Sequence, residues 1–253
     1  MIRKLLRPLR RFAHHSVERL NDWRYGIVSD AQIFLGQFGI TDPACHQYNA
    51  TSYVRFRQLM KLINIRPGED VFLDYGSGMG RAVFLAATYP FRRVIGVELI
   101  PELHAQARQN IESARRRLRC RDVKLVNIDA REYQVPGDVT VVYFWNPFSG
   151  HVLCEALGNI RKSVLENPRR VTMIFLSPTG TSSVDQIKSQ VPWLSELQRV
   201  TLGPNSVATI YGIDPSREPE TCAQGRSASP WHPAIAWLVS DASFLPSLPI
   251  PVW

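Results

Sequence analysis

The sequence predicts an α/β domain in which helices cover both faces of a seven-stranded, mostly parallel sheet. From residue 70 onward, short apolar runs alternate with amphipathic helical segments. A glycine-rich turn joins the first of these strands to a helix, and only the four residues 203–206 separate the last two strands. Because so short a link cannot hold a crossover helix, the domain should end in an antiparallel hairpin.

The strands and helices follow one another in a regular order. The first strand spans 70–75, and the glycine-rich turn opens a helix over 80–89. Pro101, a residue favoured in the first helical turn, begins a long helix through Arg117. The run at 139–145 (VTVVYFW) is apolar throughout, which predicts a strand in the middle of the sheet. The remaining strands are expected at 93–98, 123–127, 170–176, 197–202 and 207–213, and the remaining helices at 151–165 and 184–190.

The chain divides into three parts by composition. Residues 1–66 are expected to form a helical lid at the substrate entrance, and residues 67–214 to form the α/β domain. Residues 215–253 are rich in proline and form an appendage. Its aromatic residues, Trp231 and Trp237 among them, are expected to pack on their own domain, with binding of a partner as the alternative.

The N-terminal segment has the pattern of a basic amphipathic helix, because apolar residues recur at helical spacing with arginines between them. Three roles are compatible with this pattern: a lid packed on the domain, a surface that contacts the substrate or an anionic membrane, and a targeting peptide. Pro8 and the arginines interrupt the apolar run, so we expect no secretory signal. No stretch of the sequence is long and apolar enough to predict a transmembrane segment.

Composition limits which binding partners and which kinds of site are expected. The 253 residues include 30 lysines and arginines against 22 aspartates and glutamates, and the formal net charge of +8 favours anionic partners. Five arginines between 115 and 121 are expected to form a solvated helix face. The four cysteines include no CxxC pair, so we expect reduced thiols and a cytoplasmic location. The six histidines include no HExxH motif, so we expect no bound metal.

The strongest chemical signal is the segment 74–81 (DYGSGMGR) between a strand and a helix. Its glycines allow a sharp turn and a close approach to a ligand, and the helix that follows offers free N–H groups. Glu98 ends the next strand, where a carboxylate can accept both hydroxyl groups of a ribose. Asp74 would repel a pyrophosphate but suits an ammonium and a sulfonium, which favours S-adenosylmethionine (SAM) over NAD.

These segments resemble motifs I and II of the class I, Rossmann-like SAM-dependent methyltransferases, with FLDYGSGMGR at 72–81 and VIGVEL at 94–99. Ile128-Asp129-Ala130 is similar to the segment that brackets adenine, in which Asp129 would bind the adenine amino group. The alternative for Asp129 is a helix N-cap. The resemblance covers 48–214 and implies SAM as cofactor. The implied cofactor-binding residues are Asp74, Gly76, Ser77, Gly78, Gly80, Arg81, Glu98, Leu99, Asp129, Ala130, Asn146 and Thr51.

The central strand ends in Trp145-Asn146-Pro147-Phe148, at the place where class I enzymes carry their catalytic motif. The segment resembles the Asn/Asp-Pro-Pro-aromatic motif of enzymes that methylate nitrogen, with one proline in place of two. The Asn146 amide oxygen and the carbonyl near Pro147 can accept hydrogen bonds from an N–H₂ group, and Phe148 can stack on a planar amide, a base or a cation. An ordinary Asn-Pro turn is the alternative.

The segment 48–53 (YNATSY) resembles the Tyr-x-Pro-Thr/Ser loop of the non-SET histone-lysine methyltransferases, with Ala50 in place of proline. In that family the loop closes over the methionine end of SAM. The resemblance therefore implies that Tyr48 or Thr51 contacts the cofactor. The segments 22–26 and 34–39 are expected to complete the lid.

These observations predict a SAM-dependent methyltransferase that acts on a nitrogen of a protein or peptide side chain. An amide or exocyclic amine mainly needs orientation, which the Asn-Pro-Phe motif suits, whereas a lysine must first lose a proton. The alternatives are a small-molecule or natural-product methyltransferase, a nucleic-acid base methyltransferase and a non-catalytic scaffold. No separate RNA-binding module supports the nucleic-acid alternative. The intact Asp74 and Glu98 argue against a scaffold.

Overall fold

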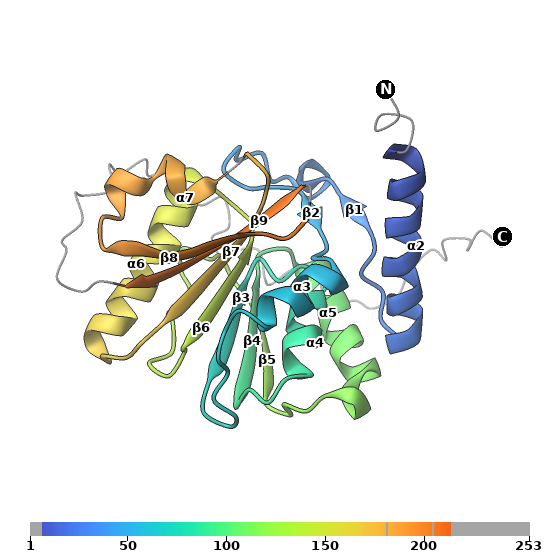
Figure 1. Ribbon diagram of the computed structural model, residues 1–253, viewed down its shortest axis with the longest axis horizontal. Helices are drawn as coiled ribbons and strands as arrows, with labels where there is room; N and C mark the ends of the chain where they lie inside the picture. The colour runs from blue at the N-terminus through green and yellow to red at the C-terminus, as the bar shows by residue number, and fades with distance from the viewer. Residues whose placement is uncertain (1–6, 181, 204, 214–253) are drawn as a thin grey trace, which may run out of the picture. The chain divides into compact units, whose positions relative to one another are not determined.

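The computed structural model describes residues 7–180, 182–203 and 205–213 (Figure 1). These residues lie in the first of the two units into which the chain divides, Met1–Cys222 and Ala223–Trp253. The predictions for the appendage at 215–253, including the packing of Trp231 and Trp237, therefore fall outside the described residues.

A seven-stranded sheet forms the centre of the described unit, with the strand order β5-β4-β3-β6-β7-β9-β8. Strands β3 to β7 pair in parallel, whereas β9 is antiparallel to both of its neighbours, β7 and β8. This order confirms the predicted mostly parallel sheet with a terminal antiparallel hairpin. The strands are β3 (Val71–Tyr75), β4 (Arg93–Glu98), β5 (Val123–Asn127), β6 (Val141–Trp145), β7 (Thr172–Pro178), β8 (Leu194–Thr201) and β9 (Ser206–Ile213).

Helices cover both faces of the sheet, with α6 and α7 on one side and α3, α4 and α5 on the other (Figure 1). Along β3 the side chains alternate: Leu73 and Tyr75 join the core under α6, and Phe72 joins the core under α3 and α4. Every residue of β3 is therefore buried, as expected of a central parallel strand. The helices are α3 (Tyr53–Met60), α4 (Arg81–Ala87), α5 (Pro101–Ser113), α6 (Gly150–Glu166) and α7 (Ser183–Gln186).

Several elements differ from the sequence prediction. The long helix ends at Ser113 and is followed by a 3-10 turn, η2 (Arg115–Arg117), a common way for a helix to end. The helix expected at 184–190 is divided into α7 and η3 (Lys188–Gln190). A small antiparallel pair, β1 (Gln32–Ile33) with β2 (Tyr48–Asn49), was not predicted. Strands of two residues carry no periodic pattern, so the sequence could not indicate them.

The expectation of reduced thiols is wrong for one cysteine. Cys45 and Cys120 are free, whereas Cys154, buried on α6, is disulfide-bonded. The missing CxxC spacing excluded pairing between near neighbours only. It carried no information on cysteines that the fold brings together from distant positions.

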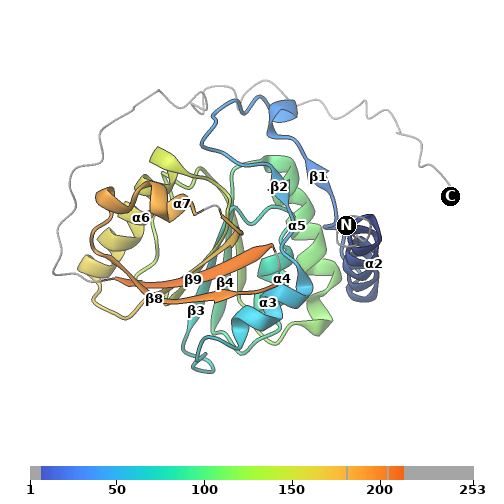
Figure 2. The same cartoon turned by 45° about the horizontal axis from the view of Figure 1, so that its top comes forward.

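The N-terminal amphipathic helix forms as α2 (Arg7–Tyr25) and lies beside the domain (Figure 2). Two acidic side chains of α2, Glu18 and Asp22, are buried on its inward side. Leu20 and Trp23 face solvent and are 61% and 80% exposed. The helix thus packs on the domain, which is one of its three expected roles, but it does so through its acidic side. None of the helices in the described ranges is long and apolar enough to cross a membrane.

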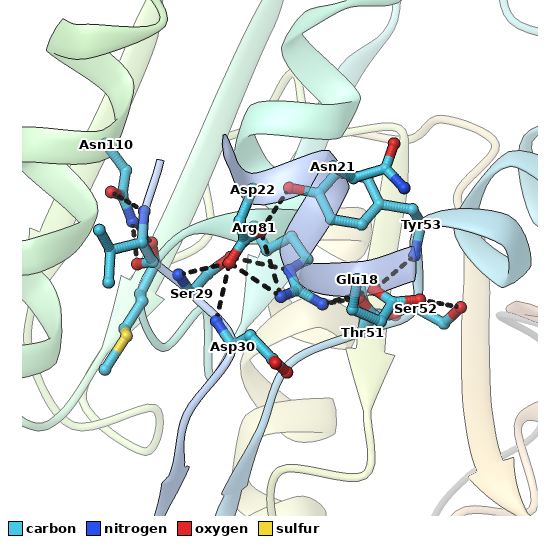
Figure 3. A network of polar contacts seen from close by, with 12 residues as sticks. Glu18, Asn21, Asp22, Ser29, Asp30, Thr51, Ser52, Tyr53, Arg81 and Asn110 are labelled. Atoms are coloured by element: carbon cyan, nitrogen blue, oxygen red, sulfur yellow. Dashed lines mark hydrogen bonds and ion pairs between the residues drawn. The ribbon is translucent and has the colours of Figure 1, made fainter. Parts of the chain in front are cut away.

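A buried arginine at the start of α4 holds α2 in place (Figure 3). Arg81 Nη1 donates to Glu18 Oε2 at 2.7 Å, and Nη2 donates to Asp22 Oδ2 at 3.2 Å. Nε donates to Ser29 Oγ at 2.7 Å, and Nη1 also donates to the Thr51 carbonyl oxygen at 3.2 Å. The planar guanidinium suits this task, since its N–H groups point in several fixed directions.

Asp22 organises the loop that follows α2. Its carboxylate accepts hydrogen bonds from the backbone N–H groups of Ser29 and Asp30, both at 2.8 Å, and from the Tyr53 hydroxyl at 2.6 Å. The guanidinium carbon of Arg81 lies 4.8 Å from the centre of the Tyr53 ring, a cation–π contact. One carboxylate therefore connects α2, its following loop and the start of α3.

Asn110 of α5 ties the same loop to the glycine-rich turn (Figure 3). Its Nδ2 donates to the carbonyl oxygens of Val28 and Met79, each at 2.8 Å, and its Oδ1 accepts from the Val28 N–H at 2.8 Å. Asn110 is buried, and these bonds use both ends of its amide group. The turn after β3 is thereby fixed to the N-terminal segment as well as to the sheet.

Replacing Arg81 by methionine should destabilise the fold. Methionine fills much of the volume but leaves the Glu18 and Asp22 carboxylates buried without the guanidinium, and breaking buried ion pairs in this way costs about 3–5 kcal/mol. Denaturant unfolding followed by circular dichroism measures the effect. The exposed Arg115→Met should change the free energy of unfolding by less than about 0.5 kcal/mol. Equal stability of the two variants would contradict the role given to Arg81.

Candidate cofactor and active site

The glycine-rich turn lies at the carboxyl ends of β3 and β4. The strand order reverses between β3 and β6, and ligands of open α/β sheets bind at such a reversal. Gly76, Gly78 and Gly80 have φ angles of 70°, 54° and 79°, in the left-handed region that other side chains disfavour. The turn therefore needs glycine at these positions for backbone reasons alone.

Two segments that are distant in sequence close on this turn. A Cβ atom at Gly78 would lie 2.1 Å from Cε2 of Tyr48, and one at Gly76 would lie 2.4 Å from Cβ of Pro147. The Tyr48 hydroxyl donates to the Ser29 carbonyl oxygen at 2.9 Å, which fixes the ring. The structure thus brings together three motifs that the sequence predicted as parts of one site.

Glu98, at the end of β4, braces the turn. One carboxylate oxygen accepts from the Gly78 N–H at 2.7 Å, and the other accepts from the Ile100 N–H at 2.9 Å. Burial raises the pKa of Glu98, although these backbone N–H groups favour its charged form. Each carboxylate oxygen can accept a further hydrogen bond, so Glu98 retains the capacity to bind the hydroxyl groups of a ribose.

Asp74 is a buried carboxylate that forms no ion pair among the described residues. Burial raises the pKa of Asp74 well above its usual value, and the charge of Glu98 raises it further. The Arg81 guanidinium, which follows the turn, is engaged by Glu18 and Asp22 instead. A cationic ligand would offset the cost of ionising Asp74, so the charge of this site favours a cation.

Three residues predicted to contact the cofactor form contacts within the protein. Nε, Nη1 and Nη2 of Arg81 all donate to acceptors of the N-terminal segment. The Thr51 hydroxyl lies 2.6 Å from the Tyr143 hydroxyl in the interior. A Cβ atom at Gly80 would lie 2.9 Å from Cβ of Ala107, so this glycine allows α4 and α5 to approach. Motif position alone did not distinguish these roles from ligand contacts.

The remaining predicted cofactor residues lie at the ends of β4 and β5. Leu99 is partly exposed, and Ala130 is buried. Asp129 forms a two-pronged ion pair with Arg131, at 2.6 Å to Nη2 and 3.0 Å to Nε. Burial alone would raise the pKa of Asp129, but the hydrogen bonds from Arg131 lower it. No helix follows Asp129 before β6, so the alternative role as a helix N-cap is wrong.

Asn146 has the sole left-handed φ angle, 44°, among non-glycine residues of the described part of the chain. Its carbonyl oxygen accepts from His46 Nδ1 at 2.9 Å, and its Oδ1 accepts from Ser183 Oγ at 2.9 Å. Cys45 and Phe148 form an antiparallel bridge beside it. Backbone strain of this kind concentrates at functional sites, where the surrounding structure enforces it.

Phe148, which was predicted to stack on a planar amide, a base or a cation, lies in the core. Its ring is 6% exposed and makes edge contacts with Tyr75 and Phe144, at centroid distances of 6.2 and 6.1 Å. These contacts leave almost no ring surface for stacking on a substrate. An aromatic residue at the end of a buried strand can fill the core equally well, and the sequence does not distinguish the two roles.

Sequence reasoning missed Glu18, Ser29, His46, Asn110 and Ser183. Asp22 was included, because it lies in the segment expected to complete the lid. Glu18 and Asp22 are four residues apart and therefore lie on one side of a helix. This acidic pair in a basic helix was the available signal. The other four act through contacts with distant residues, for which the sequence offers no local pattern.

Gly78→Ala should disturb the site through its clash with Tyr48. The new methyl group would meet the Tyr48 ring, and the left-handed backbone adds strain of about 1–2 kcal/mol. Gly39→Ala is the matched control, because Gly39 has a φ of 73° but a Cβ added there would have no atom within 4 Å. SAM affinity by calorimetry should fall at least about tenfold more in Gly78→Ala than in Gly39→Ala. Equal losses would show that backbone strain alone matters.

One family model, described as "Histone methylation protein DOT1", matches residues 44–135 of the chain. The matched part contains Tyr48, the glycine-rich turn, Glu98 and Asp129, and it ends before Asn146. No curated protein matches the chain.

Solved structures share the fold. The PH0226 protein of Pyrococcus horikoshii OT3 has a TM-score of 0.52 and 17% identity, over 71% of this chain and 99% of that one. A SAM-dependent methyltransferase of Aquifex aeolicus has a TM-score of 0.50 and 13% identity, over 62% and 89%. A variant of MtNAS in complex with SAM has a TM-score of 0.50 and 18% identity, over 64% and 63%. At these identities the likeness establishes the fold.

The family-model match, the strand order and the glycine-rich turn between Asp74 and Glu98 agree with one another. The strand order and the solved structures establish the class I, Rossmann-like fold, and the family-model match over residues 44–135 supports a SAM-dependent methyltransferase.

Proposed function

We propose that this methyltransferase transfers the methyl group to a nitrogen of a protein or peptide side chain. The observation that carries the proposal is the strained Asn146, next to a proline that packs on the glycine-rich turn. This placement sets an amide oxygen and a backbone carbonyl beside the cofactor-binding turn. The family model that matches the chain describes histone methylation proteins, which supports a protein as the acceptor.

The residues around the turn fit SAM. Asp74 would hold the cationic amino-acid part, Glu98 would bind the ribose hydroxyl groups, and Asp129 with Ala130 would bracket the adenine. The Ser77 hydroxyl is buried and has no hydrogen-bond partner among the described residues. When bound, SAM supplies an electrophilic methyl group on its sulfonium. The protein then has to orient the acceptor, exclude water and let the nitrogen lose a proton to solvent as the methyl group is transferred.

Asn146 is the residue proposed to orient the acceptor. Its backbone carbonyl accepts a hydrogen bond from Nδ1–H of His46, whose Nε2 lies 3.2 Å from Ser149 Oγ. Ser183 donates to its Oδ1, which leaves one lone pair of Oδ1 for an N–H of the acceptor. An N–H directed at that oxygen holds the nitrogen in a defined orientation, so that its lone pair can face the methyl group.

The partners of Asn146 favour an acceptor that needs orientation more than deprotonation. In the described part of the chain, the His46 side chain is bonded to the backbone carbonyl of Asn146 and the Ser183 side chain to the Oδ1 of Asn146, and no carboxylate is bonded to either oxygen. An amide nitrogen or an amine that arrives already neutral fits this arrangement better than a lysine ammonium.

Radiolabelling tests the proposed acceptor class. The purified chain is incubated with SAM carrying a tritiated methyl group and with lysate from a strain that lacks the gene. We expect the label to become sensitive to protease, and acid hydrolysis to release an N-methylated amino acid or methylamine. Label that is sensitive to nuclease, or that remains in the small-molecule fraction, would refute a protein acceptor.

Asp74→Asn should weaken SAM binding by about 1.5–3 kcal/mol, the range for hydrogen bonds to charged groups. It should also remove a pH dependence. Burial raises the pKa of Asp74 in the free protein, so at low pH the carboxyl must lose a proton before it can pair with a cation. SAM affinity should therefore rise with pH up to that raised pKa, with a proton released on binding below it.

Calorimetry in two buffers with different ionisation enthalpies measures the proton released. Asp129→Asn is the control, because hydrogen bonds from Arg131 lower the pKa of Asp129 despite its burial, and it should leave the pH dependence in place. A wild-type affinity that does not change with pH would contradict the pairing of Asp74 with a cation.

Asn146→Gly should reduce kcat on the labelled substrate roughly 100-fold by loss of orientation. Glycine preserves the left-handed backbone, so SAM affinity should stay within about threefold of wild type. Ser183→Ala removes one hydrogen bond to the amide and should cost about 2- to 12-fold in kcat. Unchanged turnover in Asn146→Gly would eliminate Asn146 from the mechanism.

A further inference from the structure

The outer side of α2 is an exposed apolar strip, defined here as Val17, Leu20 and Trp23. These side chains are 44%, 61% and 80% exposed, and their spacing of three residues places them on one side of the helix. Glu18 and Asp22 face the opposite way and are held by Arg81. Because the buried ion pairs fix the rotation of α2, the helix cannot turn to bury the strip against its own domain.

Exposed arginines surround the strip. Arg19 and Arg24 lie on α2 itself. The guanidinium carbon of Arg117 lies 5.7 Å from the centre of the Tyr25 ring, which sets the η2 region beside the C-terminal end of α2. All members of the η2 cluster are exposed: Arg115, Arg116, Arg117, Arg119 and Arg121. Arg19 and Arg24 therefore flank the strip on α2, and the exposed η2 arginines lie near the C-terminal end of the same helix.

We propose that the strip and the η2 cluster together bind the surface of an anionic lipid membrane. Tryptophan and leucine on one side of a helix enter the interface between headgroups and acyl chains, where tryptophan is especially favoured. Arginines beside them are attracted to anionic headgroups. A helix that lies in the membrane surface needs these features and no segment that crosses the bilayer.

Charge distinguishes this occupant from others that could cover an apolar strip. A second copy of the chain, related by a twofold axis, would bring Arg19 and Arg24 towards their own equivalents. A basic protein segment would likewise be repelled. An anionic membrane can bury the apolar strip and also attract the arginines.

Vesicle co-sedimentation of the full chain tests the proposal. We expect binding to vesicles with roughly 30% phosphatidylglycerol in phosphatidylcholine, much weaker binding to phosphatidylcholine alone, and a loss of binding as salt is added. The double variant Leu20→Ser, Trp23→Ser should lose at least about tenfold in affinity. Arg115→Gln and Arg116→Gln should each lose roughly fivefold.

Leu165→Ser is the matched control, because Leu165 lies on α6 and is 51% exposed. It should bind anionic vesicles as well as wild type does. SAM affinity should be unchanged in all these variants, which shows that they are folded. The vesicle assay involves no methyl acceptor, so its outcome is independent of the proposed function.

Two results would overturn the proposal. One is equal binding of the wild type, or no binding, to anionic and neutral vesicles. The other is unchanged binding of the Leu20→Ser, Trp23→Ser variant. Light scattering adds a further check, because a dimer that this double variant converts to a monomer would identify a second copy as the occupant.

Discussion

The site depends on the buried ion pairs that the Arg81 guanidinium forms with Glu18 and Asp22. Arg81 stands at the first position of α4, immediately after the glycine-rich turn. A buried ion pair adds little net stability compared with apolar packing, but it tolerates few alternative arrangements. Here it fixes α2 and its following loop relative to α4. Since the Tyr48 hydroxyl is bonded to that loop, the same contact keeps the Tyr48 ring over the turn.

Charge is distributed unevenly in this protein. The chain as a whole is strongly basic, yet Asp74 and Glu98 are buried beside the turn without an ion pair among the described residues. The unfavourable burial of these carboxylates is what would make a cation a good ligand there, because its charge replaces the lost hydration. Many of the exposed arginines lie elsewhere, among them those of α2 and η2. Cofactor and surface partner can therefore have opposite charges.

The helix α2 connects these two regions. In the part of α2 whose side chains are described, Glu18 and Asp22 belong to the Arg81 network, whereas Val17, Leu20 and Trp23 face outward, the reverse of a typical amphipathic helix packed on a domain. The arrangement is stable because the Glu18 and Asp22 carboxylates accept hydrogen bonds from the Arg81 guanidinium and from further N–H and O–H groups inside the fold. Residues distant in sequence similarly stabilise the conformation of Asn146, since His46 donates to its backbone oxygen and Ser183 to its Oδ1.

Sequence alone determined the sheet, the glycine-rich turn and the ends of its strands, because these follow from local periodicity and from backbone angles such as that of Gly78. Tertiary structure decided which polar residues meet. Arg81 and Phe148 stand at motif positions that suggest contact with a ligand. In the folded protein, Arg81 is bonded to buried carboxylates and Phe148 packs in the core. The sequence likewise did not determine which side of α2 faces outward. A pattern of apolar residues shows that a helix has an apolar face, but it does not show what that face contacts. Contacts between residues far apart in the chain decide that, and they exist only in the folded protein.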